Sequence, residues 1–357
     1  MKKLIFSRNL LHKTSLYVMI IAVITFTTVL IYNYYVSKKI ILENIQDSTR
    51  ALAVSTIFQI DTIFISAQRM PENLSYILDC TDFDEKGLKK MLRTLLENND
   101  GIYGTTIAFE PYMFDKEKDA FAPYYYKDNG EIKYKDLGKE SYNYFKWDWY
   151  INPKKLNKGV WSEPYFDKGG GGTLMVTYSQ PFYKTIDGKK EFRGIVTCDI
   201  SLDWLQALVS DMKIFQTGYA FILSPEGTFI AHPNKSYYKK GQSFFSLADE
   251  YKDKQERMIG ENMLKGQTGF VRYYSHNKGK YCYLYYAPLA STGCTLGIVI
   301  PENELLFKLK ALTFTLFLIG AIGNFLSVIL KISTKGIMAP LRAMLDMFFK
   351  KPNPPTQ

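Results

Sequence analysis

The sequence predicts an α+β protein with a long N-terminal helix and two tandem modules built on antiparallel sheets, flanked by two transmembrane helices. Three observations lead to this fold class. Two charge-free runs of about twenty residues lie near the ends of the chain, and a helical segment of about thirty residues without glycine or proline follows the first run. Short β-type segments separated by glycine, asparagine and aspartate turns then fill the middle of the 357 residues.

The first apolar run, Leu16 to Tyr35 (LYVMIIAVITFTTVLIYNYY), is close to the length that spans the hydrocarbon core of a bilayer as a helix. Basic residues precede it, as in a signal peptide. The run is longer than the apolar part of a signal peptide, and it ends in tyrosines rather than in a small-residue cleavage site. We therefore expect a cytoplasmic tail at 1–15 and an uncleaved transmembrane helix at 16–36.

The second apolar run, Ala311 to Leu330 (ALTFTLFLIGAIGNFLSVIL), predicts another transmembrane helix at 308–332. Basic residues flank both runs on the side facing the ends of the chain, which predicts that both ends are cytoplasmic. The segment 37–305 is then extracytoplasmic, and the protein is a cell-membrane protein with two spans. The basic residues are Lys2, Lys3, Arg8 and Lys13 before the first run and Lys331, Lys335, Arg342, Lys350 and Lys351 after the second.

The formal net charge of +10 does not indicate nucleic-acid binding, because much of the excess lies in these flanks and no dense basic run with a reading helix follows. The four cysteines have no CxxC spacing. A turn near residues 290–292 would pair Cys282 with a residue beyond Cys294, so we favour free, buried thiols over a disulfide framework. The other two cysteines are Cys80 and Cys198.

Residues 37–70 are predicted to form one long helix beside the membrane, because apolar residues recur there at helical spacing. The segment is too long to be covered by one small domain. We expect it to pair with a second copy of itself, which would make the protein a homodimer. The apolar positions are Ile41, Ile45, Leu52, Ile60 and Ile63.

Two β-rich units follow the helix. The strands YGTTIAF, EIKYKDL, LMVTYSQPFY and FRGIVTCDISL lead into a helix, and a second unit begins with GYAFILSPEGTFIAHP, where Glu226 and Gly227 indicate a hairpin turn. The ends of the units are alike: YSQPFY and GIVTCDISLDWL in the first correspond to YYAPLA and LGIVIPENELL in the second. This similarity predicts two copies of one α+β module, at about 75–210 and about 211–301.

This arrangement resembles the double Cache sensor domains of bacterial transmembrane signalling receptors, which consist of two tandem PAS-like, PDC-type modules. The motifs IAFEPYMF, WDWYINPKKLNKGVWSEPYFD, TYSQPFY, GIVTCDISLDWL, GYAFILSPEGTFIAHP and YYAPLASTGCTLGIVIP carry the resemblance through most of residues 100–301. It implies a membrane-distal module that binds a small solute and a membrane-proximal module that connects it to the second span.

The segment after the second span, 333–357, contains KGIMAPLRAMLDM, which resembles the first helix of a HAMP relay module. A second HAMP helix and an output domain do not follow, and the Pro-rich end KKPNPPTQ is predicted to be disordered. The chain is therefore either a truncated gene product or a receptor that signals through a separate cytoplasmic partner, with phosphatase, kinase or chemotaxis output.

The candidate site begins in YFKWDWYINP, which places five aromatic rings in ten residues. Amino-acid-binding double Cache domains carry a Tyr, an Arg, a Trp-Tyr pair, an Asp, a later Tyr and a last Asp in the distal module. The resemblance assigns these roles to Tyr142, the pair Trp149 and Tyr150, then Tyr165 and finally Asp199. A carboxylate and aromatic faces of this kind bind a ligand ammonium group.

The carboxylate-binding half of this scheme differs. The Arg position falls on Trp147, and Asn152 stands where the middle Asp is expected. Lys146 would replace the Arg as a point charge without its planar fork. Asp167, after Glu-Pro-Tyr, is an alternative acid for the ammonium group, with a solvated turn as the other interpretation, and Asp199 could instead cap the helix that follows it.

Signals of catalysis are weak. The run Gly169 to Gly172 lacks the Lys-Ser/Thr of a phosphate loop and precedes a strand, which favours a hairpin turn or pocket flap. The histidines, His12, His232 and His276, have no metal-ligand spacing, and the carboxylates form no recognisable active-site frame. We therefore predict no catalytic residues, no metal and no cofactor.

Two functions remain. The first is a membrane-bound sensor that binds a small extracellular solute, an amino acid or amine-like compound, and transmits a conformational signal across the membrane. The alternative is an exported, membrane-tethered enzyme or adhesion domain without a signalling role. A second span followed by a relay-like helix favours the sensor, because a tether needs only one anchor.

Overall fold

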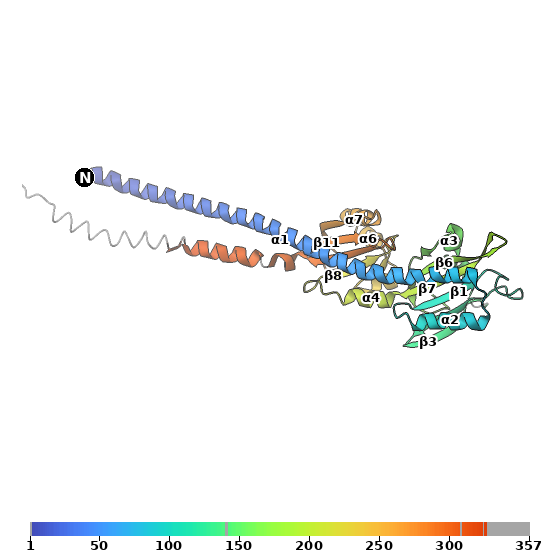
Figure 1. The fold of residues 1–357 in the computed structure, drawn as a ribbon. Coiled ribbons are helices and arrows are strands. Elements are labelled where there is room, and N and C mark those ends of the chain that lie inside the picture. The colour runs from blue at the N-terminus through green and yellow to red at the C-terminus, as the bar shows by residue number, and fades with distance from the viewer. Residues whose placement is uncertain (1, 140–141, 308, 324, 327–357) are drawn as a thin grey trace, which may run out of the picture. The chain divides into compact units, whose positions relative to one another are not determined.

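The structure, a computed structural model, describes residues 2–139, 142–307, 309–323 and 325–326. The chain divides into two compact units, and one of them, Gln46–Glu304, holds all the strands that the structure describes (Figure 1). Two helices are long and apolar enough to cross a membrane by length and composition, within Leu16–Cys80 and Glu302–Gly323. The predicted spans fall on them, although residues 308, 324 and 327–332 of the second span and the HAMP-like segment at 333–357 lie outside the described residues.

Seven α-helices and one short 3-10 helix are labelled within the described residues, and the helix Glu302–Gly323 follows the last strand. They are α1 (Lys2–Cys80), α2 (Glu85–Glu97), η1 (Tyr144–Lys146), α3 (Asp148–Leu156), α4 (Leu202–Ser210), α5 (Lys235–Lys239), α6 (Phe244–Glu250) and α7 (Lys254–Leu264).

Helix α1 extends beyond its predicted end at residue 70. It continues through Pro71 to Cys80, although a proline inside a helix removes a backbone hydrogen bond and costs roughly 3 kcal/mol. Tertiary packing offsets this cost, because Leu74 and Leu78 in the last turns of α1 are buried against α2 and the first sheet. Apolar contacts far along the chain therefore override the local signal of the proline.

The strands form two antiparallel sheets. The first has the order β3-β2-β1-β7-β6-β4, with β5 paired to β6, and the second has the order β10-β11-β12-β8-β9. The strands of the first sheet are β1 (Gly104–Phe109), β2 (Pro123–Asp128), β3 (Glu131–Asp136), β4 (Val160–Trp161), β5 (Tyr165–Phe166), β6 (Leu174–Ile186) and β7 (Lys189–Ser201). Those of the second sheet are β8 (Tyr219–Leu223), β9 (Phe229–Ala231), β10 (Gly269–Ser275), β11 (Lys280–Pro288) and β12 (Thr295–Pro301).

Both sheets share one strand connectivity. In each, the first strand of the module lies between the second and the last, and the last strand pairs with the one before it. The similar sequence segments fall on equivalent hairpins, β6–β7 and β11–β12, and each hairpin leads directly into a helix. This confirms the α+β class with a long N-terminal helix and two antiparallel-sheet modules.

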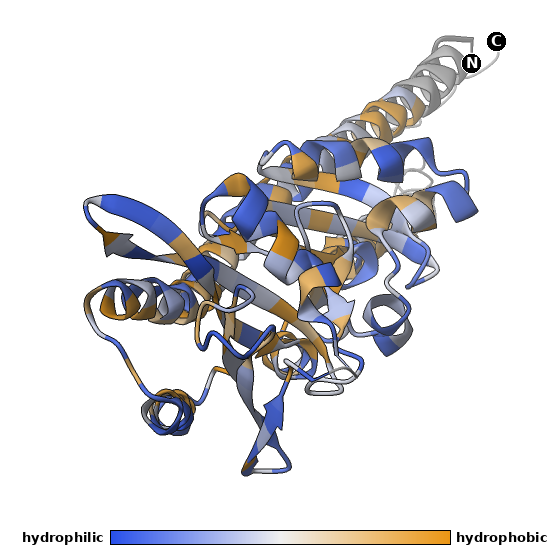
Figure 2. Ribbon diagram, turned by 90° about the vertical axis from the view of Figure 1, so that its right-hand side faces the viewer, coloured by the Kyte–Doolittle hydropathy of each residue, from blue (hydrophilic) through white to orange (hydrophobic). Residues whose placement is uncertain are grey.

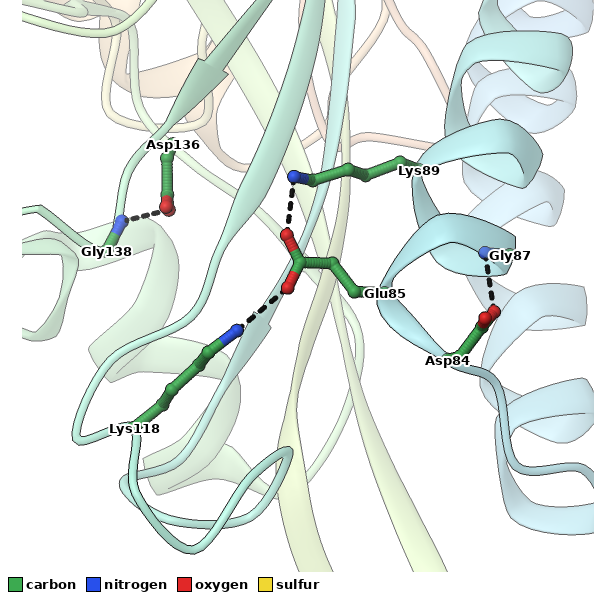
Figure 3. Close-up of polar contacts among 7 residues, drawn as sticks. All are labelled: Asp84, Glu85, Gly87, Lys89, Lys118, Asp136 and Gly138. Carbon is green, nitrogen blue, oxygen red and sulfur yellow. Dashed lines mark hydrogen bonds and ion pairs between the residues drawn. The ribbon is translucent and has the colours of Figure 1, made fainter.

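The first sheet packs against α2 and the end of α1 through one apolar core, and Figure 2 shows the mixed hydrophobic and hydrophilic residues of these helices. The start of α2 is fixed by Asp84, whose side chain accepts a 2.8 Å hydrogen bond from the Gly87 N–H (Figure 3). Glu85 lies between Lys89 and Lys118, at 2.6 and 2.8 Å, and so connects α2 to the loop after β1.

The cysteines are free, as predicted. Cys282 on β11 pairs with Pro301 rather than with Cys294, so the hairpin keeps the two thiols apart. Cys198, Cys282 and Cys294 are buried, as expected. Cys80, at the end of α1, is exposed, so the expectation of four buried thiols is wrong for this residue.

Candidate functional site

Asp199 lies near the end of β7, in the middle of the first sheet. Its backbone is paired with Thr177 of β6 on one side and with Gly104 of β1 on the other. The hydroxyl of Thr177 donates a 2.8 Å hydrogen bond to Asp199 Oδ1 and lies 2.8 Å from the hydroxyl of Tyr165. Asp199 is 3% exposed, so its carboxylate is buried on the face of the sheet rather than capping α4, whose N-cap is Ser201.

Asp167 lies in the turn between β5 and β6, where the sequence has four consecutive glycines. Its Oδ1 accepts a 2.7 Å hydrogen bond from the Tyr142 hydroxyl, and its Oδ2 accepts one of 2.6 Å from the backbone N–H of Gly171. Gly170 packs directly on the carboxylate, where an added Cβ would overlap it. The glycine run is therefore a turn that covers Asp167 and buries it.

Aromatic rings enclose the two carboxylates on the side of η1 and α3. Tyr142 stacks on Trp147 with a ring-centroid distance of 5.4 Å and 5° between the planes, and Trp147 contacts Tyr165 at 5.5 Å. The indole N–H of Trp149 donates to the Tyr142 hydroxyl over 3.4 Å. These contacts hold Tyr142 in the orientation that directs its hydroxyl at Asp167.

A small cavity of about 10 Å³ lies between these groups, which is about the room that one water needs. The Tyr124 hydroxyl, from β2, is buried there and makes no hydrogen bond of normal geometry within the part of the chain that the structure describes, although it lies near enough to Asp199 to lower the pKa of that carboxyl. A buried polar group without a partner is unfavourable and indicates a place for a polar ligand atom. The lining consists of Thr106, Tyr124, Leu137, Tyr142, Trp149, Tyr165, Asp167, Thr177, Thr197 and Asp199.

The described lining of the cavity is acidic. Among its described lining residues there are two carboxylates and no lysine or arginine. Burial raises the pKa of the Asp199 carboxyl to about 7, and the charge of Asp167 adds to this shift, whereas the hydrogen bond from Thr177 opposes it. Burial also raises the pKa of Asp167, against the hydrogen bonds from Tyr142 and Gly171. A cation between the two carboxylates would stabilise both ionised forms.

The predicted site residues do not all lie at this cavity. Tyr142, Trp149, Tyr165, Asp167 and Asp199 line it, and Trp147 forms the next layer by stacking on Tyr142. Two others lie elsewhere. Tyr150 packs against Tyr144 and Phe145 and donates a 2.5 Å hydrogen bond to Glu110 Oε1, while Lys146 is exposed and is not part of the lining.

Four polar residues of the lining were not predicted from the sequence: Thr106, Tyr124, Thr177 and Thr197. Tyr124 was missed because the strand PYYYKD, now β2, lacks an alternating pattern. A turn signal was present, because the Asn-Gly pair that follows it favours a hairpin, and the two residues have φ values of 51° and 83°.

A larger cavity of about 320 Å³ lies between α1, the segment around β4 and the second module. Phe64, Trp161, Ser224 and Cys294 are among its lining residues, together with Glu163. The Trp161 Nε1 and Glu163 Oε2 atoms are buried without a hydrogen-bond partner in the described part of the chain. This cavity is large enough for a small molecule but offers one carboxylate instead of two, so we take the Asp167–Asp199 cavity as the candidate site.

Two tandem PAS-like modules, the first with a closed acidic cavity, place the protein in the class of double sensor domains. Residues 88–207 match the family model of the first PDC sensor domain of methyl-accepting chemotaxis protein-like receptors, and residues 183–313 match that of the Cache 3/Cache 2 fusion domain. Most of the region between the two predicted spans is thus similar to PDC and Cache sensor domains.

Individual proteins support this assignment. The methyl-accepting chemotaxis protein McpA of Pseudomonas putida is 23% identical over 94% of this chain and 48% of its own length. The extracellular domain of the putative histidine kinase mmHK1S-Z3 superposes with a TM-score of 0.65 at 26% identity, over 74% of this chain and 97% of that domain. The ligand-binding domain of Mlp24 with asparagine has a TM-score of 0.53 at 21% identity, over 76% and 98%.

The chain spans about half or less of the length of the curated chemotaxis receptors that it matches.

Proposed function

We propose that the protein is a non-catalytic membrane receptor whose distal module, at about 75–210, binds a small ammonium-bearing solute between Asp167 and Asp199. The observation that carries this proposal is the pair of buried carboxylates, enclosed by aromatic rings and without a basic residue in the described lining. Buried charges in proteins are normally paired, and a ligand ammonium group would supply the missing partner.

The chemistry of the lining favours an amine over a free amino acid. An amino acid also presents a carboxylate, which usually binds an arginine or lysine. The described lining offers hydroxyl groups from Tyr124 and Thr197 instead, because the Thr106 hydroxyl already donates to the Pro123 carbonyl. Lys146, proposed from the sequence as the replacement for the arginine, would have to move in from the surface. The asparagine complex of the related Mlp24 domain keeps amino acids among the solutes to be tested.

A solute can enter only if the cavity opens, because its present volume holds about one water. The glycine turn packs directly on Asp167 and has no side chains of its own, so we take it as the flap. Its closure over the bound solute would give the open and closed forms different affinities, which is what a binding signal requires.

The second module is connected to Asp199 through α4, which begins three residues after it. Gln206 of α4 accepts a 2.6 Å hydrogen bond from the backbone N–H of His232, and the Tyr238 hydroxyl donates 2.9 Å to Asp203. A shift of β7 on solute binding would therefore move groups bonded to the second module. From there β12 leads directly into the helix Glu302–Gly323, the proposed second span.

A homodimer formed along α1 would convert such a shift into a relative movement of two chains. Ala51, Val54, Phe58 and Ile65 fall on one stripe with the spacing of a coiled-coil seam, and Asp61, which lies on the same stripe, is hydrogen-bonded to Ser291 of the second module. The Phe58 side chain is 74% exposed, and Val54 and Ile65 are exposed as well. We infer from this stripe that α1 of a second copy is the partner.

Disulfide crosslinking tests the dimer. In a chain whose four cysteines are replaced, Phe58→Cys should crosslink efficiently in membranes after mild oxidation, because two seam positions face each other. Gln59→Cys, which is exposed but lies about 100° further round the helix, is the matched control and should crosslink far less. Equal crosslinking at both positions, or none at position 58, would contradict pairing through this seam.

The proposed topology places residues 37–305 outside the cytoplasm, between the two spans. Compartment reporters fused after Ser37 and after Ser333 should therefore report opposite sides of the membrane, the first outside and the second inside. If both fusions report the same compartment, the two-span arrangement is wrong.

The solute itself can be sought by thermal unfolding of the detergent-solubilised chain. A panel should contain amines, amino acids and, for each, a neutral analogue in which a hydroxyl replaces the ammonium group. We expect one or more amines to raise the unfolding temperature while the neutral analogue does not. A panel in which anionic or neutral compounds stabilise the chain instead would refute the ammonium assignment.

A further inference from the structure

A second group of chemically reactive side chains lies in the second module, away from the solute site. Asp253, Glu256 and His276 each offer one donor atom, and these atoms all lie within 4.8 Å of one another. His276 Nε2 is 3.2 Å from Asp253 Oδ2 and 3.9 Å from Glu256 Oε2. The first two residues stand at the start of α7, and His276 follows directly after β10.

The three side chains are held in place by separate contacts. Asp253 is the N-cap of α7, and its Oδ1 accepts hydrogen bonds of 2.9 and 3.0 Å from the N–H groups of Gln255 and Glu256, which directs Oδ2 toward His276. The His276 ring stacks on Tyr251 with a centroid distance of 4.0 Å and 4° between the planes. Neither residue needs to be reoriented to offer its donor atom.

Glu256 provides the observation that points to a ligand. The residue is 5% exposed, and its Oε2 has no hydrogen-bond partner within the described residues. The 3.9 Å separation from His276 Nε2 is too long for a hydrogen bond. A buried carboxylate oxygen in this position is stabilised by a cation. A cavity of about 20 Å³, lined by Glu256 and His276, lies beside it and has room for an ion or a water.

We propose that Asp253, Glu256 and His276 bind a divalent transition metal ion such as Zn²⁺. Zinc takes imidazole nitrogen and carboxylate oxygen at about 2.0–2.2 Å, so tetrahedral donors lie roughly 3.3 Å apart. The present separations of 3.2 and 3.9 Å need only small side-chain shifts to reach this value. The imidazole and the small number of oxygen donors disfavour Ca²⁺ and Mg²⁺.

Three protein ligands leave a fourth position for water or a small ligand, and the adjoining cavity lined by Glu256 and His276 has room for one water. The ion would strengthen the link between the start of α7 and the turn after β10, which hydrogen bonds between His276 and Asp253 and from Gln255 to the Arg272 carbonyl already join. Metal would thus be a second input to the receptor, in the module nearer the proposed second span. This inference does not depend on the solute site.

Zinc binding to the full chain in detergent tests the proposal. In a Cys80→Ser background, which removes the exposed thiol, we expect equilibrium dialysis to find about one Zn²⁺ per chain and thermal unfolding to shift upward with Zn²⁺ relative to chelator. His276→Gln and Glu256→Gln should each weaken binding at least about tenfold, because even groups outside the coordination shell have that effect.

Glu261→Gln is the matched control, since Glu261 is an exposed acid on the same helix, and it should bind Zn²⁺ like the parent. Glu256→Gln keeps the shape of the buried side chain, so its unfolding in chelator verifies that the chain is folded. Stoichiometric binding that survives both ligand substitutions, or the absence of saturable binding in the parent, would overturn the proposal.

Discussion

Asp199→Asn is expected to weaken solute binding strongly and at the same time to stabilise the protein. The substitution keeps the size of the side chain and its hydrogen bond with Thr177 but removes the buried negative charge. Losing a charge-assisted hydrogen bond should cost about 1.5–3 kcal/mol of binding free energy, or roughly 10- to 150-fold in Kd. The free energy of unfolding above pH 7 should rise by on the order of 1–3 kcal/mol, because the variant no longer buries a carboxylate.

The direction of the stability change depends on pH through the pKa of Asp199. The pKa of Asp199 is about 7 in the folded chain, above its usual value of 3.8, so the folded state binds the proton more tightly than the unfolded state. The contribution of Asp199 to stability is therefore fully present below about pH 4 and is lost as the pH rises to about 7. The difference in unfolding free energy between Asp199→Asn and the parent should grow over this window and then stay constant.

Solute affinity should rise with pH, whereas the contribution of Asp199 to stability falls. An ammonium group binds the ionised carboxylate, so the parent should lose affinity as the pH falls below about 7, and binding should release a proton. Glu163→Gln, in the larger cavity, is the control and should leave affinity and its pH profile unchanged. Solute binding that is lost in Glu163→Gln but kept in Asp199→Asn would place the solute in the larger cavity and refute our assignment.

Gly170→Ala is expected to give the second-largest loss of solute binding, because it changes the glycine turn that packs on Asp167. The added Cβ would overlap the Asp167 carboxylate, which would have to turn away from Tyr142 and from the cavity. Because Asp167 is buried and both its oxygens accept hydrogen bonds, this displacement should also cost on the order of 1–3 kcal/mol of stability. Solute affinity, measured by calorimetry, should fall about tenfold or more.

Gly172→Ala separates the two effects of such a change. Gly172 has a φ of 70°, so alanine is strained there, but nothing lies within 4 Å of its added Cβ. We expect it to cost about 1 kcal/mol of stability and to leave solute affinity nearly unchanged. If both alanine variants weaken binding equally, the effect comes from strain in the turn rather than from Asp167.

The sequence predicts those features of the fold that depend on local patterns. The charge-free runs, the hairpins β6–β7 and β11–β12 and the turn at the glycine run all follow from neighbouring residues. The end of α1 does not, because Pro71 is a local stop signal and the helix continues on account of packing by Leu74 and Leu78.

The residues that line the cavity are set by the register of strand pairing and by the direction in which each side chain points. A single sequence provides neither. Tyr124 reaches the site because β2 pairs with β1 so that Tyr124 is opposite Thr106. Trp149 and Tyr150 are adjacent on α3 and therefore point about 100° apart, so only Trp149 faces the cavity. The Asp253–His276 contact joins two segments that are 23 residues apart, which is why no ligand spacing is visible along the chain.

The most direct test of the solute site is a crystal structure of the chain with a stabilising amine from the panel. We predict that the ammonium nitrogen lies about 2.7–2.9 Å from carboxylate oxygens of Asp167 and Asp199, with the glycine turn closed over it and the Tyr124 hydroxyl hydrogen-bonded to the solute or to a water beside it. Electron density for the solute in the larger cavity beside Glu163, with the Asp167–Asp199 cavity still closed and empty of it, would contradict the account.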